Sequence, residues 1–151
     1  CEIRTAKRSD AAKIHKILTN YAEEKLLLPR TIEDIEKNIS AFKVAVKNGN
    51  IVGCCAAKNY GKGLFEIRSL AVLKPYNGKG VGTSLIRKWI SSLRRKKEAK
   101  RIFALTYRSA LFERIGFDIV SKDLFPEKVW TDCAVCPKKE KCDETAVLMQ
   151  L

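Results

Sequence analysis

The sequence predicts a single-domain α/β fold in which a mixed, mostly antiparallel sheet is flanked by helices. Two observations lead there: helical apolar patterns precede a run of strand-like segments, and a glycine-rich loop joins one such segment to an amphipathic helix. At 151 residues the chain is long enough for one domain with a real core. Because it has no internal repeat, low-complexity tract or linker, we expect residues 1–151 to form one domain.

The first forty residues predict two helices. Ser9 or Asp10 can cap the first helix, whose apolar side chains recur at helical spacing. Thr31 and Asp34 resemble a capping box that opens the second helix.

The middle of the chain predicts three strands. Apolar runs at 42–46 and 51–57 flank Asn48-Gly49, a strong hairpin signal, so two antiparallel strands are expected. Residues 64–73 supply the third strand, which leads directly into the glycine-rich loop.

The remaining elements complete the sheet. A helix that begins at Val81 carries an apolar stripe and should pack flat on the sheet. Ser109 can cap a short helix that ends at Gly116. The other segments expected here are strands at 101–106, 117–120 and 146–151 and the short helix at 110–115.

The loop from Asn77 to Thr83 is the clearest candidate for a binding site. Its glycines let consecutive backbone N–H groups point toward one anion, and the following helix adds the positive end of its dipole. The Walker spacing and the third Rossmann glycine are both absent. We therefore expect a phosphate or pyrophosphate ligand that is not bound as in a P-loop NTPase, with a ligand-free tight connection as the alternative.

The formal net charge of +13 could attract nucleic acid, an anionic membrane or a polyanionic small molecule. The basic run at 94–101 lies at a helix end and has no interleaved aromatic residues, which favours a solvated helix end over a nucleic-acid site. No apolar run has membrane-spanning length and no signal region is visible, so the six cysteines are expected reduced in the cytoplasm. We expect neither a nucleic-acid nor a membrane partner.

A Cys-containing C-terminal segment, about residues 126–145, raises the question of zinc. A closed zinc site takes four ligands, and this segment offers Cys133, Cys136 and Cys142 but no histidine. No metal is therefore expected. His15, the only histidine, falls on the polar side of the first helix without a nucleophile nearby in sequence, which argues against a catalytic triad.

Several motifs together carry a family resemblance. They are Ile3-Arg4 with Ala6 and Asp10, Leu70-Ala71-Val72 with Pro75, Gly78-Lys79-Gly80-Val81-Gly82, and Leu111-Phe112 followed by Gly116-Phe117. With the order of elements, these resemble the GNAT superfamily of acetyl-CoA-dependent N-acetyltransferases. Asn77 stands where that motif usually has Arg or Gln, which leaves the first phosphate contact to the backbone.

A narrower resemblance is carried by five further segments. They are Leu28-Pro29-Arg30, Gly53-Cys54-Cys55-Ala56, Glu66-Ile67-Arg68-Ser69-Leu70-Ala71-Val72, Leu105-Thr106-Tyr107-Arg108-Ser109 and Pro126-Glu127-Lys128-Val129-Trp130. These look like N-acetylglutamate synthases of the short bacterial form, without an amino-acid-kinase domain. The implied reaction converts acetyl-CoA and L-glutamate to N-acetyl-L-glutamate and CoA, the first step of arginine biosynthesis.

The resemblance implies acetyl-CoA as co-substrate. Its pyrophosphate is expected on the backbone N–H groups of the loop, with side-chain contact from Lys79 or Thr83. Backbone groups of the preceding strand are expected to hold the pantetheine and polarise the thioester carbonyl. The cofactor-binding residues implied are Leu70, Ala71, Val72, Asn77, Gly78, Lys79, Gly80, Val81, Gly82 and Thr83.

Glu66 is the candidate general base, acting through water, because it lies on the strand that leads to the cofactor loop. Strand alternation puts Glu66 and Arg68 on one face, so a structural charge pair is the alternative. Many family members carry a tyrosine as general acid where this chain has Phe112. Tyr107 or Ser109 can replace it, or the thiolate leaves unprotonated.

Arginine side chains suit the two carboxylates of glutamate, because a guanidinium binds a carboxylate through two donors. The resemblance selects Arg30 and Arg108, with Arg68 as a lesser candidate and backbone near Cys55 as a further contact. A small-molecule substrate is thus expected, and a homodimer is compatible with the sequence. The alternatives are another small amine or a protein N-terminus as acceptor, or a non-catalytic CoA- or nucleic-acid-binding module.

Overall fold

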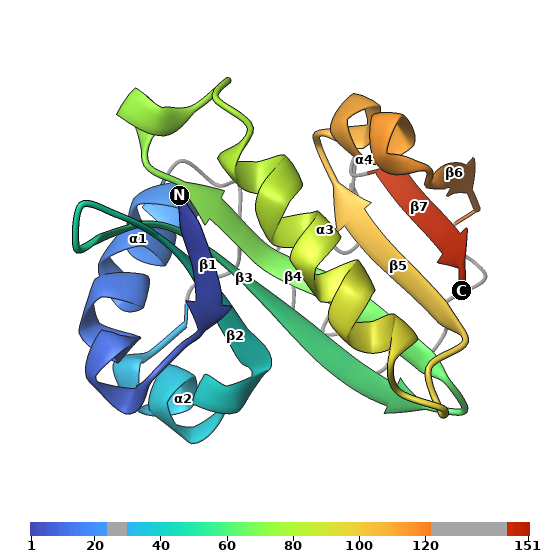
Figure 1. Cartoon of the computed structure of the whole chain (residues 1–151), viewed down its shortest axis with the longest axis horizontal. Coiled ribbons are helices and arrows are strands. Elements are labelled where there is room, and N and C mark those ends of the chain that lie inside the picture. Colours follow the sequence, from blue (N-terminus) through green and yellow to red (C-terminus); the bar gives the residue numbers. More distant parts are fainter. Residues whose placement is uncertain (24–29, 122–144) are drawn as a thin grey trace. The chain divides into compact units, whose positions relative to one another are not determined.

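The computed structural model describes residues 1–23, 30–121 and 145–151. The described strands form a seven-stranded sheet in the order β1-β2-β3-β4-β5-β7-β6 (Figure 1). The strands are β1 (Glu2–Thr5), β2 (Phe42–Lys47), β3 (Asn50–Gly61), β4 (Leu64–Val72), β5 (Arg101–Thr106), β6 (Asp118–Val120) and β7 (Thr145–Gln150). The helices are α1 (Ala11–Glu23), α2 (Ile32–Lys37), α3 (Val81–Arg94) and α4 (Ser109–Ile115), with short 3-10 turns at Arg8–Asp10, Ile39–Ala41 and Lys74–Tyr76.

The strand directions confirm the predicted fold class. The pairs β1–β2, β2–β3, β5–β7 and β6–β7 are antiparallel, whereas β4 and β5 run parallel. Contacts divide the chain into two compact units, residues 1–58 with 67–96 and residues 59–66 with 97–151. In the described parts of the chain, no helix combines the length and apolarity needed to cross a membrane.

The first unit has helices on both faces of its strands. Ile14 and Ile17 of α1 and Ile35 of α2 belong to one buried cluster with Phe42, Val44 and Cys54 of the strands. On the other face, the Cα of Gly53 lies so close to α3 that a Cβ there would be 3.2 Å from a side-chain atom of Val81. Successive residues of a strand point to opposite faces, and this alternation explains the two layers.

The second unit is built around β5. This strand pairs with the first half of β4 on one side and with β7 on the other, and α4 packs against β6 and β7. Leu64, Phe103 and Ala146 form its small buried cluster, against which Tyr60 packs with ring centroids 5.7 Å apart from Phe103.

The predicted helix starts are partly confirmed. The Thr31 side chain accepts a hydrogen bond from the Asp34 N–H, as a helix cap should, at 3.1 Å. The prediction that Ser109 caps the last helix is wrong: Arg108 occupies the cap position and Ser109 begins the helix. The Thr106 hydroxyl accepts the Arg108 N–H at 2.8 Å, so the polar side chain that orders this start lies three residues earlier.

Two other boundaries differ from the prediction. The segment expected at 51–57 continues to Gly61, because the chain turns only at 61–63, where three successive residues have positive φ. Ser9 and Asp10 lie in a 3-10 turn before α1, where the Asp10 carboxylate accepts the Lys7 N–H at 2.7 Å. Gly116, with φ of 124°, ends α4 as predicted.

Candidate active site

Ser69 lies within strand β4 in the first unit and has an unusual backbone conformation. Its φ of 53° is left-handed, which is uncommon for a residue other than glycine and is typical of a β-bulge. Two contacts hold it: Arg30 Nη1 donates to Ser69 Oγ at 3.3 Å, and the Cys54 thiol approaches the Ser69 carbonyl at 3.6 Å.

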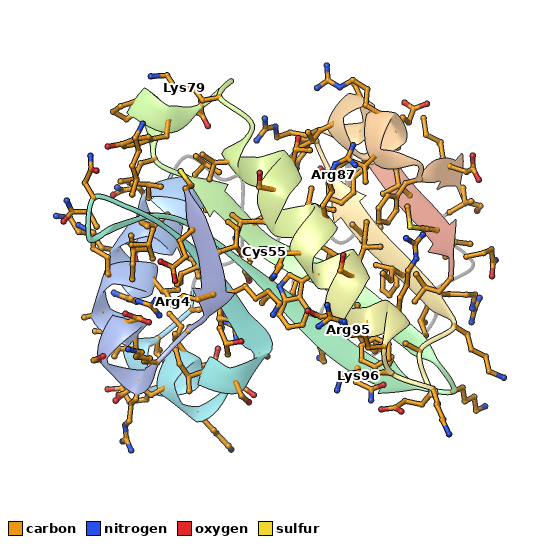
Figure 2. The ribbon with its side chains drawn as sticks, in the orientation of Figure 1. Arg4, Cys55, Lys79, Arg87, Arg95 and Lys96 are labelled. Carbon is orange, nitrogen blue, oxygen red and sulfur yellow. The ribbon has the colours of Figure 1, made fainter. Side chains whose placement is uncertain are left out.

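The glycine-rich loop follows this strand and has the geometry of an anion site. Gly78 and Gly80 have φ of 75° and 82°, and a Cβ added at either would meet nothing within 4 Å. Asn77 to Gly80 are exposed, and Lys79 stands on this loop in Figure 2. Among the described residues no side chain caps α3, so the first N–H groups of this helix, from Val81 on, have no side-chain acceptor there.

These features fit a pyrophosphate group. Open space above glycine backbone lets a phosphate oxygen approach the N–H groups closely, and the helix dipole favours negative charge there. The sequence-predicted cofactor residues from Leu70 to Thr83 therefore lie on one continuous segment, the end of β4, the loop and the first turn of α3.

Arg30 is held beside the same strand. Its Nε donates to Asp34 Oδ2 at 2.7 Å, and its guanidinium lies over the Phe42 ring, 5.0 Å from the centroid. Only 15% of the side chain is exposed. Among the described residues, Nη2 has no hydrogen-bond partner, so this nitrogen can donate to a carboxylate of a ligand.

Cys54 and Cys55 are both fully buried, so neither thiol faces solvent. Burial raises the pKa of Cys54 to about 12 and the pKa of Cys55 well above its ordinary value. The Cys55 carbonyl accepts the Trp89 Nε1–H at 2.9 Å, which fixes the indole of α3 against β3. A nucleophilic role for either thiol is thereby disfavoured, while a contact of Cys55 backbone with the amino acid stays a prediction.

In the second unit, Glu66 is 2% exposed and its Oε1 accepts the Tyr60 hydroxyl hydrogen at 2.9 Å. A buried carboxylate oriented by a phenol suits a general base that works through water. Sequence reasoning missed Tyr60, because the strand was predicted to stop at residue 57.

The remaining predicted residues lie on or near the start of α4 or on β4. Tyr107 is 39% exposed and Arg108 is exposed, while Ser109 is half-buried at the first turn. Arg68 is half-buried on β4. Phe112, which stands where the family often has tyrosine, is buried edge-to-face against Phe117 with centroids 5.1 Å apart.

Metal ligands do not gather in the described ranges: no group of three His, Cys, Asp or Glu side chains could hold an ion there. Residues 24–29 and 122–144 lie outside the described residues, and with them Cys133, Cys136, Cys142 and the motif segments at 28–29 and 126–130. The expectation of a metal-free C-terminal segment stays a prediction.

Comparison with known proteins defines the class. Residues 10–117 match the acetyltransferase (GNAT) family. The chain belongs to this family. The matched residues include strand β4, the glycine loop and helix α3 described above. It is an acetyl-CoA-dependent N-acetyltransferase, in agreement with the predicted co-substrate.

Sequence relatives narrow the class. An uncharacterized N-acetyltransferase of Chlorobaculum tepidum is 40% identical over 99% of this chain and 96% of its own length. An amino-acid acetyltransferase of Mycobacterium tuberculosis is 30% identical over 76% of this chain and 67% of its own length. The amino-acid acetyltransferase of Neisseria meningitidis is 33% identical over 83% of this chain, which spans only 29% of that enzyme.

Solved structures of similar proteins have the same fold. A Mycobacterium tuberculosis protein in complex with CoA and a second ligand superposes with a TM-score of 0.84 at 26% identity, with 100% of this chain and 99% of that chain covered. N-acetylglutamate synthase from Neisseria gonorrhoeae, in complex with coenzyme A and N-acetyl-glutamate, superposes with a TM-score of 0.87 at 28% identity. That match covers 99% of this chain and 35% of the synthase.

Proposed function

We propose that this protein acetylates the α-amine of L-glutamate, giving N-acetyl-L-glutamate and CoA. The observation that carries the proposal is the placement of Arg30, whose guanidinium is bonded to the bulge residue Ser69 on the strand that leads to the cofactor loop. A carboxylate bound to Arg30 Nη2 would lie beside the strand whose backbone holds the acetyl donor. The relatives named amino-acid acetyltransferase support an amino acid as acceptor.

The mechanism follows from what each group can donate or accept. The loop N–H groups and the dipole of α3 bind the pyrophosphate, and the backbone of residues 70–72 aligns the thioester and hydrogen-bonds its carbonyl oxygen as negative charge develops. Arg30 fixes one substrate carboxylate, and Arg108 and Arg68 are the proposed partners of the other.

Proton transfer is the proposed role of Glu66. Glu66, oriented by Tyr60, takes a proton from the ammonium group through a water molecule, so that the neutral amine can attack the carbonyl carbon. The C–N bond forms as the C–S bond breaks, and the departing thiolate receives a proton from Tyr107, Ser109 or solvent. As proposed, the reaction is the first step of arginine biosynthesis, carried out in the cytoplasm.

The test is release of CoA thiol from acetyl-CoA with L-glutamate, beside aspartate, glutamine, ornithine and polyamines. Loss of one charge-assisted hydrogen bond of about 1.5–3 kcal/mol predicts that Arg30→Ala raises the KM for glutamate about tenfold to about 150-fold. The KM for acetyl-CoA should change little, because Arg30 is bonded to the hydroxyl group of Ser69 and to no residue of the glycine loop.

Two control variants separate binding from structure. Arg8→Ala removes an arginine whose ion pair with Glu36 is 3.0 Å long and whose side chain is 80% exposed, so it should leave both KM values unchanged. Asp34→Asn keeps Arg30 but removes its ion-pair partner, and should retain most glutamate affinity. Turnover with another amine and none with glutamate would overturn the proposed substrate while leaving the fold and the acetyl donor intact.

A further inference from the structure

Lys43 is an unusual residue for its place on β2. It is only 8% exposed, and its Nζ lies over the ring of Trp89 in α3, 4.6 Å from the centroid. Lysines are rarely buried to this extent unless a carboxylate pairs with them. In the described residues Lys43 makes no ion pair or hydrogen bond, so the indole ring is the contact that compensates its charge.

The ring beneath Lys43 is fixed in place. Trp89 is 7% exposed and its Nε1–H is bonded to the Cys55 carbonyl at 2.9 Å. Cys55 is in turn the register partner of Lys43 across β2 and β3. Trp89 and Cys55 thus fix the surroundings of the Lys43 ammonium group, which makes this a preformed arrangement and not a freely moving surface lysine.

Two more cations flank the same spot. Lys88 and Arg95 are seven residues apart, so rotations of about 100° per residue put both on one side of α3, about 10 Å apart along its axis. Arg87 and Arg94 each precede one of them by one residue and so point about 100° away from it. The pKa of Lys43 is lowered first by burial and then by the charges of Lys88 and Arg95, so both cations act on its ammonium group.

The surrounding elements supply no negative charge. Neither α3 nor β2 contains an acidic residue, and Thr5, the partner of Lys43 on β1, is neutral. The acid on β1, Glu2, is two residues from Arg4 and shares its face of the strand, which is the face opposite to that of Lys43. Its charge raises the pKa of Arg4. Lys43 and the two cations that act on it therefore have no counter-charge on these elements, an arrangement that costs free energy unless an anion binds.

The ammonium group can still be reached from outside. Among the described residues, every fully buried side-chain nitrogen or oxygen has a hydrogen-bond partner, and Lys43 Nζ makes none with them. Its nitrogen must therefore keep a small contact with solvent. This contact is where an anion would meet the ammonium group.

We propose that Lys43, Lys88 and Arg95 form a second anion site on the flank of α3, which binds a phosphate group. Lysine and arginine together suit a tetrahedral oxyanion, since the ammonium acts as a point charge and the guanidinium offers paired donors. The site is separate from the glycine loop: with a rise of 1.5 Å per residue, Lys88 lies about 10 Å and Arg95 about 20 Å along the helix from Val81.

The experiment is calorimetric titration of inorganic phosphate into the protein saturated with CoA, which occupies the loop, at constant ionic strength. A phosphate monoester, glycerol phosphate, forms a second arm that distinguishes free phosphate from a phosphate-bearing metabolite. We expect saturable binding, weakened at least tenfold by Lys43→Met and by Arg95→Gln, because each removes a charge-assisted contact. The matched control Arg87→Gln, which removes an arginine of α3 that is not among the charges acting on Lys43, should bind like wild type.

Three results would overturn the proposal. They are the absence of saturation in the millimolar range, equal affinity in wild type, Lys43→Met and Arg95→Gln, or an equal loss in Arg87→Gln, which would indicate diffuse attraction to a basic protein. Arg95→Gln changes an exposed side chain, so its result stands even if Lys43→Met perturbs folding. Salt-sensitive binding to a duplex oligonucleotide without phosphate binding would replace the small anion with nucleic acid.

Discussion

Replacement of Gly80 by alanine tests whether the glycine loop binds the acetyl donor. Gly80 has φ of 82° directly before α3, and the position of an added Cβ is empty to 4 Å. Alanine in this left-handed conformation costs about 1 kcal/mol of stability. The methyl group would also occupy the space through which a phosphate oxygen reaches the first N–H groups of α3.

The size of the binding effect follows from that contact. Loss of one charge-assisted hydrogen bond, about 1.5–3 kcal/mol, weakens binding of CoA about tenfold to about 150-fold. Calorimetric titration of CoA measures the dissociation constant, and initial rates at varied acetyl-CoA give the matching rise in KM. Chemical denaturation measures the stability loss separately.

Gly49 offers a matched control in the same unit. It also has positive φ, 77°, and an equally empty Cβ position, but it lies in the turn between β2 and β3. Gly49→Ala should therefore lose the same stability and keep CoA affinity. If Gly49→Ala and Gly80→Ala weaken CoA binding equally, or if neither does, the loop is a structural turn and the reasoning is refuted.

Three further predictions concern the same unit. Asp10→Asn should lower the free energy of unfolding by about 1–3 kcal/mol near neutral pH, because it breaks the 2.7 Å ion pair with Arg4 that lowers the Asp10 pKa. This stability is lost as Asp10 of the wild type becomes protonated, so the urea midpoints of the two proteins should converge below pH 3.8. Cys54 and Cys55, with raised pKa values, should resist thiol reagents until the protein unfolds, as peptide mass spectrometry can check; rapid labelling in the folded state would contradict their burial. Gly53→Ala should cost about 1–3 kcal/mol in denaturant and weaken CoA binding, because its Cβ would lie 3.2 Å from both a β4 carbonyl and α3, and an unchanged CoA affinity would show that the spacing is not needed.

Local signals were sufficient for much of the fold. The hairpin at Asn48-Gly49, the cap at Thr31 and the apolar stripe of α3 were all predicted, because each depends on neighbouring residues and their periodicity. The same holds for the position of the glycine loop before α3, while its binding of the cofactor stays a prediction. The early end predicted for β3 failed because residues 58–61 carry no apolar alternation strong enough to mark a strand.

Other features could be found only in the folded structure. No property of a serine in a strand predicts the left-handed Ser69, which is held by Arg30 from 39 residues away. The pairing of Tyr60 with Glu66 depends on a turn at 61–63, and the burial of Lys43 against Trp89 joins a strand to a helix 46 positions later. Such contacts depend on which faces meet after folding.

The sequence by itself determined the family, the order of the elements and the backbone that can bind a pyrophosphate, since these follow from residue type at fixed local spacing. Only the tertiary structure decided which of the thirty basic side chains are held in place, with Arg30 fixed on the bulged strand and Lys43 fixed over Trp89. The reason is physical: charge alone is the same for every lysine and arginine, whereas burial and the distance to a partner depend on the packing of segments far apart in the chain.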